Sequence, residues 1–136
     1  MSQRQESASD DLTGSMEISV HPRLVIARFA TPHTTLTGRH GAALVDALKG
    51  IVGAGGERFG LLADAAGVTG TDSDYRAATG SFFGQHRDSA RIALVNLGPV
   101  IRVLAEMFRI GIRLDLRMFA DEPAARAWLR AQGIDA

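Results

Sequence analysis

The first regular pattern of apolar and polar residues begins at Met16. Met16, Ile18 and Val20 alternate with polar residues, and an apolar run over residues 24–29 follows after a three-residue segment that contains a proline. Alternation with a period of two is typical of strands, and so short a connection favours a tight turn. The sequence therefore predicts an antiparallel β-hairpin at the start of the fold.

Helical and extended patterns alternate along the rest of the chain. Thr37 can cap a helix in which Leu44, Leu48 and Ile51 fall on one face. In chain order, the further predicted elements are a strand over 59–63, a glycine- and threonine-rich loop over 67–71, a helix from Asp72 or Ser73 to Gln85, a strand over 92–97, a helix from Pro99 to Gly111, an edge strand over 112–118 and a helix from Asp121 to Gly133. This order, ββαβαβαβα, predicts an α/β fold: a mixed five-stranded sheet with an N-terminal antiparallel hairpin and four helices.

Residues 1–15 are polar and contain few large apolar side chains. We expect them to form a disordered tail in front of one domain over residues 16–136. They lack the apolar core of a signal peptide, and no later run reaches the roughly 20 apolar residues of a membrane span. A cytoplasmic location is the resulting expectation.

Composition argues against several classes of function. The 15 basic and 15 acidic residues balance, so the positive charge typical of nucleic-acid binders is missing. The chain has no cysteine, and its four histidines stand at no metal-ligand spacing. Residues 53–58 resemble a dinucleotide loop only superficially, because they lie between a helix and the next strand. With no catalytic constellation and no cofactor or metal motif, a binding function is favoured over an enzyme.

A loop after the strand 59–63 is the first candidate site. It runs from Asp64 to Tyr75 and leads from the carboxyl end of a strand into the start of a helix, where functional loops of α/β sheets gather. The alternative interpretation is a solvated turn in which Asp72 only caps the helix.

The same loop carries a family resemblance. The pattern D-x-x-G-V-x-x-x-D-S, formed by Asp64, Gly67, Val68, Asp72 and Ser73, resembles the signature of STAS domains. These are the anti-sigma factor antagonist modules that also occur on anion transporters. The C-terminal segments 91–97, 99–108 and 119–129 resemble the SpoIIAA-like, or STAS/SEC14-like, branch of bacterial proteins.

The resemblance implies a non-catalytic regulatory domain that binds another protein, such as a regulatory kinase or an anti-sigma-type factor. In antagonist proteins the residue directly after the D-S pair is the phosphorylated serine or threonine, but here it is Asp74, followed by Tyr75. Asp74 supplies a carboxylate without the full charge of a phosphate. Ser73 and Thr71 remain as candidate phosphorylation sites nearby. The implied partner-binding loop thus comprises Asp64, Gly67, Thr71, Asp72, Ser73, Asp74 and Tyr75.

The predicted helix from Pro99 has more apolar residues than one buried face requires. Only Arg102, Glu106 and Arg109 interrupt its apolar surface. The surplus is either buried between the sheet and a neighbouring helix or forms an exposed patch for a partner, a second copy of the chain or an acyl chain.

The preceding helix adds to that surplus. Its glycines, Gly80 and Gly84, each cost roughly 1 kcal/mol relative to alanine, so we expect it to be short or mobile. Its adjacent Phe82 and Phe83 should not both face the same core. Together with three residues of the following helix they predict a surface for a partner or for a hydrophobic ligand, as a SEC14-like protein would have: Phe82, Phe83, Leu104, Met107 and Phe108. A lipid or another hydrophobic small molecule is therefore the alternative ligand, and the same surface would suit a homodimer.

Overall fold

The computed structural model describes residues 16–53 and 55–136. The predicted tail, residues 1–15, lies outside the described residues. A central sheet has the strand order β1-β2-β4-β6-β7. Its strands are β1 (Glu17–His21), β2 (Leu24–Arg28), β4 (Phe59–Asp64), β6 (Ala90–Val95) and β7 (Asp115–Phe119). The helices are α2 (Gly38–Lys49), α3 (Ser73–Gln85), α4 (Pro99–Ile112) and α5 (Glu122–Ala131).

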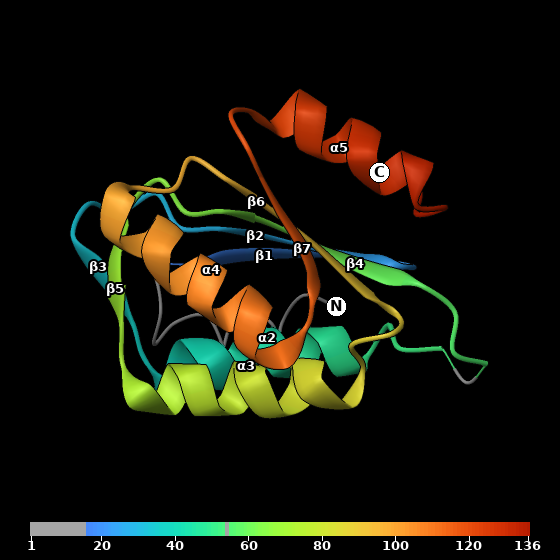
Figure 1. Ribbon diagram of the computed structural model, residues 1–136, viewed down its shortest axis with the longest axis horizontal. Helices are drawn as coiled ribbons and strands as arrows, with labels where there is room; N and C mark the ends of the chain where they lie inside the picture. Colours follow the sequence, from blue (N-terminus) through green and yellow to red (C-terminus); the bar gives the residue numbers. More distant parts are fainter. Residues whose placement is uncertain (1–15, 54) are drawn as a thin grey trace.

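The sheet confirms the predicted fold class. β1 and β2 pair antiparallel, and every other neighbouring pair is parallel. Each crossover from β2 onward leads to the next strand on the same side, so right-handed connections place α2, α3 and α4 on one face. α5 follows the edge strand β7 and covers the opposite face (Figure 1).

A second, two-stranded sheet was missed by the sequence pattern. β3 (Thr34–Leu36) and β5 (Val68–Thr71) pair in parallel, so the predicted loop over 67–71 is largely a strand. These strands have only three and four residues, which is too short for a recognisable alternation. Their buried side chains, Leu36 and Val68, nevertheless join the main core.

The predicted helix from Asp72 or Ser73 to Gln85 is confirmed, and one other helix prediction was wrong in detail. α3 has its full 13 residues and is not short, because packing against its neighbours compensates for the poor propensity of its glycines. α4 does not stop at Gly111 but continues to Ile112. It ends at Arg113, which has the left-handed conformation with φ 64° and donates its backbone N–H to the Arg109 carbonyl.

The core has one part on each side of the sheet. The larger part lies between the sheet and α2, α3 and α4, and the smaller part lies under α5. Phe82 and Phe83 are 4% and 2% exposed, and both belong to the larger part, so the expectation that they face different surroundings was wrong. α3 packs against α2 on one side and α4 on the other, and its buried arc is therefore wide enough for two adjacent side chains.

Candidate functional site

The predicted partner-binding loop divides into structural and exposed residues. Asp72 is the N-cap of α3, and its carboxylate accepts a hydrogen bond of 2.8 Å from the backbone N–H of Tyr75. Asp64 accepts hydrogen bonds from the Ala66 backbone and from the Asn96 side chain. Ser73 and Asp74 are exposed in the first turn of α3. The structure thus leaves these last two available at the surface.

Gly67 has a steric role. Its backbone N–H donates to the Phe29 carbonyl at 2.7 Å, and its own carbonyl accepts from Thr34. A Cβ atom at this position would meet the carbonyl group of Thr31, 2.6 Å from its carbon. The glycine therefore permits the close approach of two backbone segments and is buried rather than part of a binding surface.

An apolar cavity of about 130 Å³ lies between the sheet, α3 and α4. Five of the predicted site residues line it: Thr71, Tyr75, Phe83, Leu104 and Phe108. Further lining residues come from the sheet and α4, namely Leu61, Ala63, Ile92, Leu94, Leu116, Ile101 and Ala105. The cavity therefore brings together residues from both predicted sites, the loop and the hydrophobic surface.

Few polar groups reach this cavity. Burial of the Tyr75 phenol raises its pKa to about 12, so this side chain is neutral at physiological pH. The Thr79 hydroxyl donates to the Tyr75 carbonyl at 2.9 Å and is thus already satisfied within α3. Arg76 is an exposed residue of the lining, and its Nη1 donates to the carbonyl and the hydroxyl of Thr71 at 2.7 and 2.9 Å.

The other two residues of the predicted hydrophobic surface lie elsewhere. Phe82 does not line the cavity. Its ring packs against Phe59 and His86, with centroids 6.1 and 4.7 Å apart. Met107 is 64% exposed on the outer side of α4. Phe82 is therefore a core residue, whereas Met107 belongs to the molecular surface.

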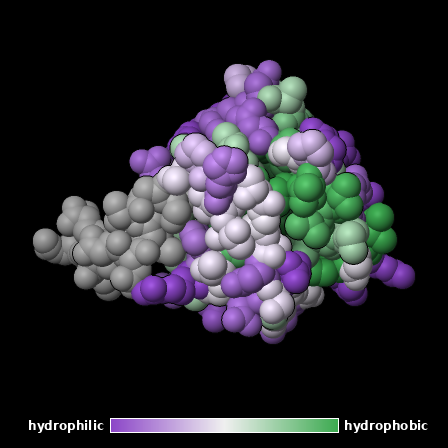
Figure 2. All heavy atoms as spheres, turned by 90° about the vertical axis from the view of Figure 1, so that its left-hand side faces the viewer, coloured by the Kyte–Doolittle hydropathy of each residue, from purple (hydrophilic) through white to green (hydrophobic). Residues whose placement is uncertain are grey.

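The outer side of α4 exposes a row of large apolar side chains. Val100, Val103, Met107 and Ile110 are 61%, 58%, 64% and 66% exposed. Figure 2, which views the molecule from the left-hand side of Figure 1, shows hydrophobic surface gathered on one side of that view, beside a paler centre. Large exposed apolar side chains that lie side by side mark contact sites on protein surfaces. Of the two interpretations of the apolar surplus of this helix, exposure is the one observed.

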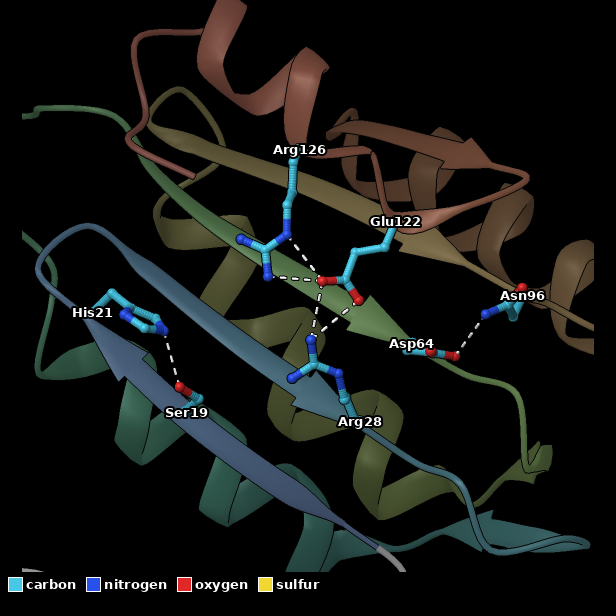
Figure 3. A network of polar contacts seen from close by, with 7 residues as sticks. All are labelled: Ser19, His21, Arg28, Asp64, Asn96, Glu122 and Arg126. Carbon is cyan, nitrogen blue, oxygen red and sulfur yellow. Dashed lines mark hydrogen bonds and ion pairs between the residues drawn. The ribbon is translucent and has the colours of Figure 1, made fainter. Parts of the chain in front are cut away.

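A separate polar network joins α5 to β2 (Figure 3). Glu122 accepts hydrogen bonds from Arg126 at 2.7 Å and from Arg28 at 3.0 Å. The hydrogen bond from Arg126, helped by Arg28, lowers the pKa of the Glu122 carboxyl below its usual value despite partial burial. The carboxylate is thus held between two arginines, which is a structural arrangement that fixes the start of α5.

The described ranges contain neither a metal-binding cluster nor a membrane-spanning helix. Histidine, aspartate and glutamate side chains form no group of three that would hold a metal ion within residues 16–53 and 55–136. His40, for example, is buried at the start of α2, where its Nδ1 accepts from the Thr37 backbone N–H. In the same ranges no helix has the length and apolar character that crossing a membrane requires.

The sequence matches the family model described as SpoIIAA-like over residues 30–130. The chain belongs to the SpoIIAA-like family. The match includes the β5–α3 segment and α4, and therefore the whole cavity wall that these elements form. No curated protein matches the sequence.

Solved structures similar to this SpoIIAA-like domain share its fold. An uncharacterised protein of Shewanella loihica with a SpoIIAA-like fold has a TM-score of 0.62 at 14% identity, and the match covers 84% of this chain and 91% of that one. The anti-sigma factor antagonist SpoIIAA in its unphosphorylated form has a TM-score of 0.53 at 16% identity, covering 88% and 99%. The murine anion transporter Slc26a9 has a TM-score of 0.54 at 17% identity; 82% of this chain matches 18% of the transporter.

The sequence interpretation missed Arg76 and, although it named an exposed apolar patch on α4 as one alternative, placed only Met107 of the observed row in the candidate site. Val100, Val103 and Ile110 were left out, although with Met107 they stand three, four and three residues apart, a spacing that places all four on one helix face. No motif marks Arg76. Its guanidinium reaches back from the first turn of α3 to Thr71, five residues earlier, and it belongs to the cavity lining.

Proposed function

We propose that this SpoIIAA-like domain is a regulatory module that binds another protein through the outer face of α4. The exposed row formed by Val100, Val103, Met107 and Ile110 is the observation that carries this proposal. Alternating spacings of three and four residues form the kind of seam into which the side chains of a second helix pack. The expected partner element is therefore an amphipathic helix.

Charges beside the row indicate what that helix would carry. Arg102 and Arg113 are exposed, whereas Arg109 is paired with Glu106 at 2.8 Å. Within residues 16–53 and 55–136 Arg102 and Arg113 have no carboxylate partner, and acidic side chains on the partner helix would complement them. Such rim charges contribute more to the association rate and to partner choice than to affinity.

The type of partner and its regulation are proposed by analogy. SpoIIAA, which shares the fold, is an anti-sigma factor antagonist. We extend this to a regulatory kinase or an anti-sigma-type factor as the partner. Ser73 is the favoured phosphorylation site, since it is exposed in the first turn of α3, where a phosphate is stabilised by the helix dipole. Thr71 is less accessible because its hydroxyl accepts a hydrogen bond from Arg76.

Site-specific photo-cross-linking in native cells tests the proposed face. A cross-linking amino acid at Val103 should capture one defined protein, and the additional substitution Met107→Arg should abolish the adduct. Val20, which is 48% exposed on β1 at the far edge of the sheet, provides the matched control position. The same adducts from both positions, or a Val103 adduct that survives Met107→Arg, would exclude α4 as the interface. Because Met107 is exposed, its substitution should change stability by no more than about 0.5 kcal/mol.

The cavity favours a second candidate function, the binding of a small hydrophobic ligand. Its volume of about 130 Å³ and its apolar lining are the specific observations. An engineered apolar cavity of about 150 Å³ in another protein stays dry and binds benzene, so this one is large enough for a ring or a short alkyl chain. Titration with 1-hexanol, followed by the methyl NMR signals of Leu104 and Ile101, tests it. Shifts should be confined to lining residues, and uniform or absent shifts would refute cavity binding.

A further inference from the structure

We infer that the ligand of this cavity is a small carboxylic acid whose apolar part fills the cavity and whose carboxylate is bound by Arg76. This inference rests on the ligand-binding function proposed above and specifies the class of ligand. Among the described residues that line the cavity, Arg76 is the single cationic side chain. The remaining lining is apolar, apart from Tyr75 and two threonines.

The hydrogen bonds of Arg76 leave one edge of the guanidinium available. Nη1 alone donates to the carbonyl and the hydroxyl of Thr71. Across the described part of the chain, Arg76 makes no ion pair with a carboxylate. Nε and Nη2 are therefore the two donors that could bind both oxygens of a carboxylate in parallel. The bonds to Thr71 restrain the side chain beforehand, which reduces the entropy that binding would cost.

The neighbouring acidic residues do not occupy this position. Asp72 accepts a hydrogen bond from the Tyr75 backbone as the cap of α3. Asp74 is exposed, and its carboxylate lies on the α2 side, with Oδ2 3.7 Å from the position that a Cβ atom on Gly38 would take. The two carboxylates at the start of α3 are thus engaged in capping or lie on the side of α2. The opening of the cavity beside Arg76 is therefore free to bind an anion.

Size and polarity restrict the acid further. A cavity of about 130 Å³ is well below the roughly 300–1,000 Å³ of pockets for drug-sized ligands. A long acyl chain would therefore have to extend beyond the cavity. The neutral Tyr75 and the internally bonded Thr79 hydroxyl leave no second charge inside, so a molecule with a second ionised group is disfavoured. The class is consequently monocarboxylic acids with a short alkyl chain or a single ring.

A comparison of hexanoate with 1-hexanol tests the inference, since the two probes share a chain length and differ in charge. Binding is measured on the full chain by methyl NMR titration, for the wild type, Arg76→Gln and Arg87→Gln. Arg87 is an exposed arginine near the C-terminal end of α3 and serves as the matched control. We expect the wild type and Arg87→Gln to prefer hexanoate by about tenfold, and Arg76→Gln to lose this preference while still binding 1-hexanol.

The outcomes separate the two proposals. Equal affinity for both probes in the wild type would overturn the role of Arg76 and leave the cavity as a site for neutral ligands. Binding of neither probe would overturn the ligand-binding function and this inference together. A preference for hexanoate that survives in Arg76→Gln would assign the anion to another group and also overturn the inference. Added salt provides an internal check, because it should weaken binding of hexanoate and not of 1-hexanol.

Discussion

Substitution of Gly67 by alanine should destabilise the fold strongly although it adds only one methyl group. The new Cβ would meet the Thr31 carbonyl group, whose carbon lies 2.6 Å away, and it would be 2.9 Å from the Ala30 carbonyl carbon. Both neighbours are backbone atoms, so no side-chain rotation can relieve the contact. The segment that joins β2 to β3 must move away from Gly67.

The hydrogen bonds at this junction set the magnitude. The shift would strain or break the bond from Gly67 to Phe29, 2.7 Å, and the bond from Thr34 to Gly67, 2.9 Å. Each contributes about 0.5–1.5 kcal/mol net, and overpacking of a tight site adds about 1–3 kcal/mol. The expected loss in unfolding free energy is therefore about 3 kcal/mol, equivalent to a fall in Tm of roughly 10 °C for a domain of this size.

Urea denaturation followed by circular dichroism, at pH 7.5, measures this loss. Gly111→Ala is the matched control, because Gly111 is exposed in α4 and a Cβ there would have no neighbour within 4 Å. Alanine is the better helix former, so the control should be neutral or more stable by up to about 1 kcal/mol. A Gly67→Ala protein within about 0.5 kcal/mol of the wild type would refute the reasoning, since the backbone contact would then be easily relieved.

Three further predictions concern a helix contact and two buried titratable groups. Gly80→Ala should raise the unfolding free energy by about 0.5–1 kcal/mol in the same urea assay, since the added Cβ would lie 3.6 Å from Ile112 without a clash; a loss of stability would contradict this. Burial lowers the pKa of His40 in the folded state. Its contribution to the unfolding free energy should therefore be complete above about pH 6.5 and should decline at lower pH, where His40 is protonated in the unfolded chain before it is protonated in the folded one. Equal stability at pH 7.5 and pH 5.5, or a decline unchanged in His40→Asn, would contradict the assignment. Tyr75 is the single tyrosine and has a pKa raised to about 12, so absorbance at about 295 nm should show ionisation near pH 10 only after unfolding.

Much of the fold follows from local patterns, and the exceptions have a common physical cause. The strands β4 and β6 could be predicted because each is a short apolar run. The helix α5 could be predicted because its apolar spacing and its capping residue Asp121 coincide. β3 and β5 could not, because three and four residues are too few for a recognisable alternation, and their pairing depends on the close backbone approach at Gly67. α4 ends at Arg113, which adopts the left-handed conformation. The sequence pattern pointed instead to Gly111, because glycine is the residue that usually adopts this conformation at a helix end.

The candidate site was also only partly predictable from local patterns. Whether the apolar side chains of a helix are buried or exposed depends on the position of that helix in its layer. Since each crossover leads to the next strand in one direction, the helices on that face follow chain order, and α3 lies between α2 and α4 (Figure 1). The middle helix packs against both α2 and α4, which is why Phe82 and Phe83 are both in the core. α4 is the last helix of the layer, and none of the other described helices lies on its outer side. Its surplus of apolar side chains therefore remains exposed unless another molecule covers it. Knowledge of the strand order would have been enough to favour exposure over burial.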